Sequence, residues 1–364
     1  MPGKGLSLES IYHAFEATTL QPIITIPALV YALRQPDRLN SLLVHAFGTA
    51  PLFSVQAVKK SLQVLTVLGI IIRLNRYLSR KAANNWTVDK TFDPKKEIVV
   101  VTGGSQGLGL CIAQSFAARG VKVAALDKNE PKSALPENVT FYQADLVDWQ
   151  DVNNAAERIR TDIGDPTVVV NNAGISEQTP LLLPQDAQES PSGAAARIEG
   201  FQQVLDVNLT AHLRTSLAFV PAMIASNHGH LVSISSMLAY AGTSPSCEYC
   251  MSKVAVQAFH EVLAMELKHT HKAPKIRTTS YFPVWLRTPM AEARLKRSEL
   301  PSWMLLEPED YAEEIVMQVF KGESGGQVVS PARLNVFTGI RGFPLWLQIF
   351  IKELFFLDGV PKHA

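Results

Sequence analysis

The fold is decided by a strand that runs directly into a glycine-rich turn, residues 98–109, with the sequence IVVVTGGSQGLG. The run Ile98–Val101 has no polar alternation, as is typical of a strand covered on both faces. The glycines permit a tight turn, and the following helical stretch would present free N–H groups and a partial positive charge. The turn is thus a cradle suited to a pyrophosphate. Because an ordinary strand-to-helix turn also uses glycine, the interpretation depends on context.

Outward from this turn, short β-branched runs alternate with helical patterns, the order expected of βαβ units in a parallel sheet. Prolines and polar residues over 178–200 predict a surface loop. The sequence therefore predicts an α/β, Rossmann-like doubly wound parallel sheet in a single catalytic domain with apolar extensions at both ends. Strands are expected near 97–102, 121–127, 139–143, 167–171, 230–235, 275–282 and 326–329, and helices near 107–119, 149–163, 198–226, 247–270 and 308–320.

Composition divides the 364 residues into four parts. We expect an apolar, helical, membrane-associated extension over 1–83, a polar linker over 84–95 that ends in Asp-Pro, and the NAD(P)-binding catalytic domain over 96–330. An apolar tail over 331–364 follows.

Charge and cysteine content exclude several kinds of protein. The formal net charge is +1, so no basic field for a nucleic-acid partner is evident. Three cysteines form no disulfide framework, which favours a reducing, cytosol-facing compartment. Residues 1–16 lack the features of a secretory signal, and we expect the N-terminus to be retained.

An acidic residue, Asp127, ends the second predicted strand. Its carboxylate could accept hydrogen bonds from ribose hydroxyls and would repel a 2′-phosphate, which favours NAD. Lys128 follows directly and could soften that preference, so NADP is not excluded. Asp127 could also be a solvated turn residue.

A phenol and an ammonium, Tyr249 and Lys253, stand four residues apart on one predicted helix. The cation can depress the phenol pKa from its usual ~10 and suit it to acid/base work. The pair alone is common on helices, but Ser236 stands at the end of the strand before it, with Ser235 as the competing hydroxyl. We expect no metal site, because the cysteines at 247 and 250 have no second ligand pair at suitable spacing.

The joint order of these motifs resembles the short-chain dehydrogenase/reductase family over about 97–330. The resemblance implies that Tyr249 is the general acid/base, that Ser236 holds the substrate oxygen and that Lys253 binds the nicotinamide ribose. It also implies that Asn208 holds a water of a proton relay. The remaining cofactor contacts would be Gly103, Ser105, Gln106, Gly107, Leu108, Gly109, Asp127, Asp145 with the following Leu146, Asn171, Ala173, Gly174, Pro283 and Thr288.

One position departs from the family's pattern. The family commonly places glycine after the proline that ends the sixth strand, whereas this chain has Val284 after Pro283. Thr288 still aligns with the residue that contacts the carboxamide.

Both ends of the chain are apolar. Residues 61–72 are uncharged between basic flanks, but at ~1.5 Å per residue they span roughly 18 Å, short of a ~30 Å hydrocarbon core. They suggest monotopic insertion, with packing on the core or a dimer interface as alternatives. Phe343–Leu357 is expected to be a docked lid or a membrane-contacting helix.

Residues 289–308, which often cover the substrate in this family, contain several large apolar side chains and predict a lipophilic substrate. With the apolar ends, they resemble the membrane-associated branch that handles retinoids, steroids and long-chain alcohols. The expected reaction is hydride transfer between NAD(H) and a lipophilic alcohol or ketone, on the endoplasmic reticulum or a lipid droplet, with a homodimer possible. An NADPH-dependent ketoreductase and a catalytically silent scaffold are the alternatives.

Overall fold

The chain forms two compact units, Met1–Ala82 and Ala83–Ala364. This computed structural model describes residues 20–48, 54–177, 191–291 and 305–356. In the first unit, α2 (Pro22–Arg34) and α3 (Pro36–Phe47) each begin with a proline, which suits the first turn of a helix because no N–H is needed there. The third helix, α4 (Val55–Ala83), is 29 residues long.

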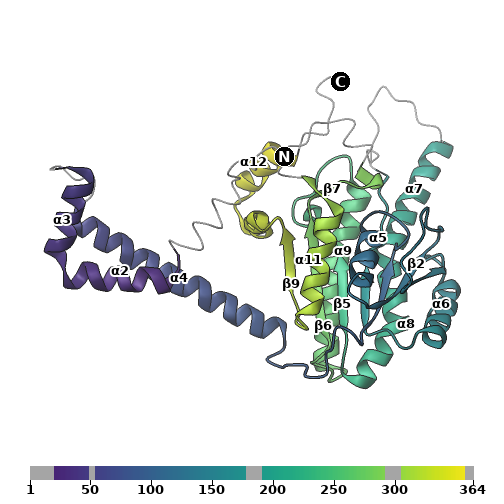
Figure 1. Cartoon of the computed structure of the whole chain (residues 1–364). Coiled ribbons are helices and arrows are strands. Elements are labelled where there is room, and N and C mark those ends of the chain that lie inside the picture. Colours follow the sequence, from purple (N-terminus) through teal and green to yellow (C-terminus); the bar gives the residue numbers. More distant parts are fainter. Residues whose placement is uncertain (1–19, 49–53, 178–190, 292–304, 357–364) are drawn as a thin grey trace. The chain divides into compact units, whose positions relative to one another are not determined.

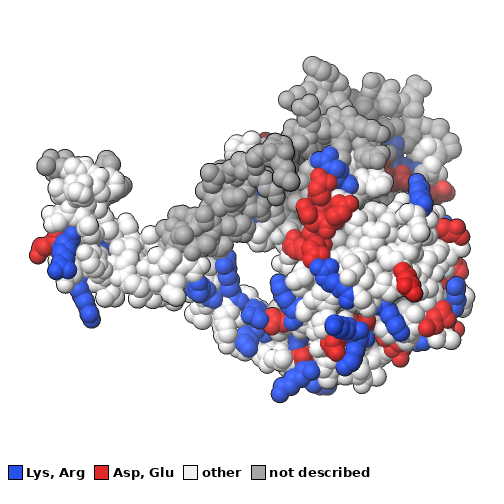
Figure 2. All heavy atoms as spheres, in the orientation of Figure 1, with Lys and Arg blue, Asp and Glu red and all other residues white. Residues whose placement is uncertain are grey.

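Most of α4 is not buried although the helix is apolar. Only Thr66 and Gly69 are buried along it, and its length and composition would allow it to cross a membrane. The helix continues beyond the uncharged run at 61–72 in both directions, so the structured element is longer than that run. Figure 2 shows that most of the visible surface of these N-terminal helices carries no charged side chain.

The second unit is built on a seven-stranded sheet with the order β3-β2-β1-β4-β5-β6-β9, and every neighbouring pair is parallel (Figure 1). This strand order confirms the predicted doubly wound sheet. The runs of branched apolar residues are buried, as expected for parallel strands covered on both faces. The strands are β1 (Ile98–Thr102), β2 (Lys122–Asp127), β3 (Val139–Gln143), β4 (Val168–Asn171), β5 (His230–Ile234), β6 (Arg277–Pro283) and β9 (Gly326–Ser330).

Alternate residues of the strands contribute to two separate cores, one on each face of the sheet. Val99 and Val101 pack on one face with α5 (Gly107–Ala117) and α11 (Pro308–Phe320). Val100 packs on the other face with α6 (Trp149–Asp162), α8 (Ala211–Ser226) and α9 (Cys247–His269).

The helical region before β5 differs from the prediction. The surface loop expected over 178–200 is wrong from Pro191 onward, because α7 (Pro191–Leu205) begins there with proline in its first turn. The single helix expected over 198–226 is α7, a π-helical turn η1 (Asp206–Thr210) and α8. The parts of the predicted loop and substrate cover at 178–190 and 292–304 lie outside the described residues.

The segment that joins α4 to β1 is held at the edge of the sheet where the strands begin. Arg277, the first residue of β6, donates to the backbone carbonyls of Asn84 and Thr87. His228, just before β5, lies between Asp89 at 2.5 Å and Glu97 at 3.0 Å. Both carboxylates are almost fully buried, so this polar cluster fixes the segment to the sheet.

After β9 the chain forms the 3-10 helical segment η4 (Ala332–Gly342) and the apolar helix α12 (Leu345–Phe356). Phe337, Phe343 and Ile351 pack on a third cluster that includes Tyr240 and Phe282. The C-terminal segment is therefore part of the second unit's core.

Candidate active site

The glycine turn between β1 and α5 leaves room for a ligand against the backbone. Gly103 and Gly107 adopt positive φ angles of 65° and 54°, which side chains rarely tolerate. A Cβ on Gly109 would lie 2.0 Å from the carbonyl oxygen of Gly103, so only glycine lets α5 approach the turn this closely. A Cβ on Gly107 would face Thr288 at 3.8 Å, across the pocket. These residues fit a dinucleotide pyrophosphate at the start of α5.

Asp127 lies at the end of β2, beside this turn. Its carboxylate accepts hydrogen bonds from the Ser105 backbone N–H at 3.1 Å and from the Ser105 hydroxyl at 2.6 Å. Asn129 donates to its second oxygen. Asp127 thus orders the glycine turn as well as lining the pocket.

The neighbouring Lys128 is paired with Asp145, with 2.6 Å between the ammonium and the carboxylate. This contact raises the pKa of Lys128, and it also lowers the pKa of Asp145 against the opposing effect of burial. The ammonium that could attract a 2′-phosphate is therefore already engaged by a carboxylate.

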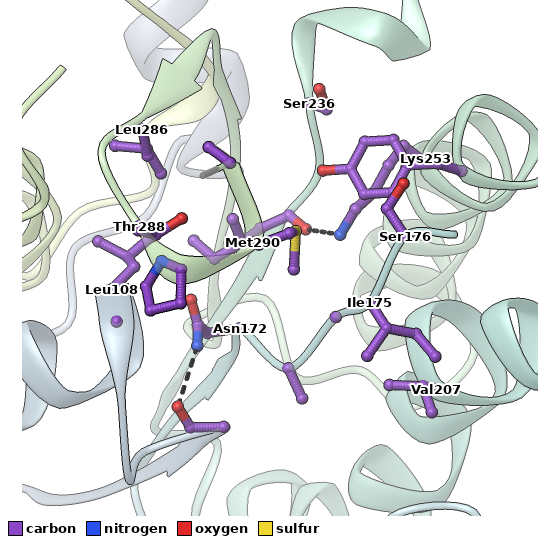
Figure 3. Close-up of a pocket in the computed structure, with 18 of the residues that line it drawn as sticks. Leu108, Asn172, Ile175, Ser176, Val207, Ser236, Lys253, Leu286, Thr288 and Met290 are labelled. Carbon is purple, nitrogen blue, oxygen red and sulfur yellow. Dashed lines mark hydrogen bonds between the residues drawn. The ribbon is translucent and has the colours of Figure 1, made fainter. Parts of the chain in front are cut away.

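The chemical groups meet where β5 ends and α9 begins (Figure 3). The Lys253 ammonium donates to the Ile234 carbonyl at 2.9 Å and lies 5.4 Å from the centre of the Tyr249 ring. The Ser235 hydroxyl donates to the Lys253 backbone carbonyl, whereas the Ser236 hydroxyl interacts with the Tyr249 phenol. The Ser235 hydroxyl is thus engaged by the backbone of α9, and Ser236, whose hydroxyl accepts from the Leu238 N–H at 3.2 Å, is the serine that influences the pKa of the phenol.

Burial governs the acidity of both titratable groups. It raises the pKa of Tyr249 to about 12, with the interaction with Ser236 opposing the rise. It lowers the pKa of the Lys253 ammonium to about 8. The sequence predicted a phenol pKa lowered by Lys253, but in the free protein the cost of burying a phenolate dominates, and the interaction with Ser236 offsets only part of it.

Asn208 lies in the π-helical turn η1 and is fully buried. Its amide oxygen accepts from the Ile175 N–H at 2.7 Å, and its amide nitrogen donates to the Ile175 carbonyl and to the Ser252 hydroxyl. The side chain therefore ties η1 to the segment after β4 and to α9. A π-helical turn often marks a functional position, but the sequence analysis did not anticipate one here.

One cavity of about 380 Å³ brings most of the predicted residues together. Four of them do not line it: Ser105 and Gly109 support the turn, Asn208 lies behind the wall, and Asn171 accepts a hydrogen bond from Thr215. The predicted residues that line it are Gly103, Gln106, Gly107, Leu108, Asp127, Asp145, Leu146, Ala173, Gly174, Ser236, Tyr249, Lys253, Pro283 and Thr288.

The cavity also has lining residues that the sequence analysis missed. Asn172 donates from its side chain to the Thr102 carbonyl, closing the wall between β1 and β4, and its place beside Asn171 could have suggested it. Ser176 and Gln203 lie in no recognisable sequence motif, so no signal in the sequence pointed to them. The apolar wall is formed by Ile175, Val207, Met237, Leu238, Val284, Trp285, Leu286 and Met290.

A profile of the short chain dehydrogenase family matches residues 97–299, and the chain belongs to this family. It is an oxidoreductase of the type that acts on CH–OH groups with NAD(H) or NADP(H). The fold also resembles ligand-free aldohexose dehydrogenase from Thermoplasma acidophilum, with a TM-score of 0.54 and 23% identity over 65% of this chain and 93% of that one.

Three relatives are similar across the catalytic unit. Dehydrogenase RED2 of Cochliobolus heterostrophus is 35% identical over 60% of this chain and 79% of its own length. Human epidermal retinol dehydrogenase 2 is 33% identical, covering 62% and 71%. Human estradiol 17-beta-dehydrogenase 11 is 30% identical, covering 62% and 75%.

Proposed function

We propose that this protein transfers hydride between NAD(H) and a lipophilic alcohol or ketone of the retinoid, steroid or long-chain alcohol type. The observation that carries this proposal is one cavity in which Ser236, Tyr249 and Lys253 face a largely apolar wall. Two relatives are named for retinol and estradiol, which are both lipophilic alcohols. An apolar wall with a few convergent polar groups suits such substrates.

In the proposed oxidation, Tyr249 acts as the phenolate and takes the hydroxyl proton of the substrate, and Ser236 holds the substrate oxygen beside it. The nicotinamide, when bound, supplies or accepts the hydride. Lys253 binds the nicotinamide ribose, and its ammonium favours the phenolate through space. Asn208 orders the backbone that would hold a relay water behind Lys253.

The glycine turn would hold the pyrophosphate, and Asp127 the adenosine ribose. We favour NAD over NADP on two grounds. The Asp127 carboxylate would repel a 2′-phosphate, and Asp145 already engages the Lys128 ammonium. Thr288, whose side chain would lie 3.8 Å from a Cβ on Gly107, would contact the carboxamide.

The N-terminal unit would attach the protein to a membrane. Its helices expose large apolar side chains, and α4 buries little of its surface in the unit. Although α4 as a whole is long enough to cross a membrane, its uncharged run at 61–72 is shorter than a bilayer core and lies between basic residues, which favours insertion from one side. Sparse cysteines support a cytosol-facing catalytic unit, and lipophilic substrates support the endoplasmic reticulum or a lipid droplet.

A homodimer is also part of the proposal. Leu213 and Leu217 on α8 and Val262 and Met265 on α9 are large apolar side chains exposed on two helices. A second copy would cover them. Sedimentation velocity of the detergent-solubilised protein should show a dimer that Leu217→Glu dissociates; an unchanged monomer for both proteins would contradict the homodimer.

The function is tested by following NADH formation with the purified protein and a panel of lipophilic and short-chain alcohols, and NADH consumption with the matching ketones. Repeating the panel with NADP(H) tests the cofactor. We expect turnover of lipophilic secondary or allylic alcohols with NAD. Absence of turnover with every alcohol and ketone, alongside detectable NADH binding, would favour a silent binding protein.

A further inference from the structure

The C-terminal segment lies directly behind the wall of the active-site cavity. Phe337, Phe343 and Ile351 pack on a buried cluster that contains Met237, and the partly buried Val284 packs against the same cluster. Met237 and Val284 also line the cavity. One side of α12 is therefore anchored to the structure that shapes the substrate site.

The other side of α12 is apolar and exposed. Trp346 is 69% exposed and Phe350 is 56% exposed, and Leu345, Ile349 and Leu354 are also exposed. A water-facing surface rarely gathers this many large apolar side chains along one short helix. The helix has only two charged residues, Lys352 and Glu353, and both lie in its second half.

We propose that this exposed face of α12 lies in the interfacial layer of a lipid bilayer and that the cavity takes its substrate from that bilayer. The proposal rests on the proposed lipophilic substrate. A bilayer is favoured as the occupant because the same chain has a separate apolar helix, α4, suited to a membrane. Tryptophan and aromatic side chains at one face are typical of interfacial helices.

The position of Glu353 limits how deeply the helix can lie. Glu353 follows Ile349 by four residues and so extends from the same side of α12. A carboxylate is costly in hydrocarbon, so this end stays at headgroup level while Trp346 and Phe350 reach the acyl boundary. The helix is therefore tilted, with its first half deeper than its second.

The cavity shares Met237 and Val284 with the cluster on which α12 packs, and it has an exposed apolar lining residue. Met290 lines the cavity and is also 43% exposed. If α12 rests on the bilayer, a substrate can move from lipid to the cavity along apolar side chains. It then avoids the cost of fully hydrating its apolar body.

Fluorescence quenching tests the contact without any catalysis. The full-length protein is bound to phosphatidylcholine vesicles with brominated acyl chains, and its emission is compared with that of Trp346→Phe. We expect the emission attributable to Trp346 to be quenched in brominated vesicles and not in ordinary ones. Unquenched Trp346 emission in membrane-bound protein would overturn the proposal.

Kinetics test the route of the substrate. The double variant Trp346→Glu/Phe350→Glu should raise the KM for a long-chain alcohol dissolved in vesicles by roughly tenfold or more, as expected when the apolar burial of two aromatic side chains is lost. Its kinetics with a short, water-soluble alcohol should be unchanged. Trp149→Glu is the control, because Trp149 is an exposed tryptophan on α6 that does not line the cavity.

The possible negative results of these experiments can be distinguished from one another. Equal KM changes for both substrates, or none for either, would overturn the bilayer route. Loss of a dimer in the double variant, together with no lipid quenching of Trp346 in the unmodified protein, would assign the face to a second copy instead. Absence of turnover with any alcohol, together with quenched Trp346, would contradict the proposed function while supporting the contact.

Discussion

Tyr249 is subject to opposing influences on its acidity. Burial favours the neutral phenol, whereas the nearby Lys253 ammonium and the Ser236 hydroxyl favour the phenolate. A bound nicotinamide cation would add to the second group. The pKa of the Tyr249 phenol is about 12 in the free protein, so the phenol is protonated near neutral pH. Tyr249 can therefore accept the substrate proton only when the bound ligands lower this pKa.

Replacing Tyr249 with phenylalanine removes the hydroxyl and keeps the ring. We expect turnover to fall by at least about 100-fold, the lower range for loss of a general acid/base. Binding of NADH, followed by its fluorescence, should persist because the glycine turn is unaffected. Turnover close to that of the unmodified protein would remove Tyr249 from the mechanism.

Asp127 has two functions that substitution can separate. Asp127→Asn keeps one oxygen acceptor, which can accept from Ser105, but loses the charge, whereas Asp127→Ala loses both. We expect the asparagine variant to reduce the preference for NAD over NADP, measured as the ratio of kcat/KM values, by roughly tenfold. The alanine variant should also weaken binding of both cofactors. An unchanged ratio in both variants would contradict the assignment.

At the scale of helices and strands, the sequence was sufficient where one physical signal dominated. Short β-branched runs predicted all seven strands of the large sheet, and those of β1 and β4 showed no polar alternation; the glycine turn predicted the start of α5. The π-helical turn around Asn208 was not predictable, because it depends on contacts with Ile175 and Ser252 from other elements. The start of α7 was missed because proline suits both a loop and a first helical turn.

The buried cluster around His228 was also invisible in the sequence, since Asp89 and Glu97 lie more than a hundred positions away. Hydrogen bonds to Glu97 and Asp89 raise the pKa of His228 from 6.5 to about 9, against the effect of burial. The cluster's contribution to stability is therefore complete below pH 6.5 and is lost as pH rises through about 9.

We expect His228→Gln to lower the free energy of unfolding at pH 7 by about 2 kcal/mol, the usual scale for hydrogen bonds to charged groups. The difference between the two proteins should shrink between pH 7 and 10, measured by urea unfolding in one detergent. Thr161→Ala, on the exposed face of α6, is a control that should show no such pH dependence. A difference that stays constant with pH would contradict a protonated His228.

At the scale of the molecule, the second unit contains the sheet, both of its cores and the whole cavity. Removing residues 1–82 should therefore preserve turnover of a water-soluble alcohol. We expect the full chain to need detergent for extraction from membranes and the shortened chain to be released by alkaline carbonate. A shortened chain that stays in the carbonate-washed pellet would contradict anchoring by the first unit.

The attachment of the segment after α4 has a mechanical consequence. Asn84, Thr87 and Asp89 are bonded where β5 and β6 begin, whereas the cavity lies where the strands end. A force applied through the segment after α4 is therefore carried by the edge of the sheet where β5 and β6 begin. The described residues that line the cavity lie at the opposite edge, away from the path of that force.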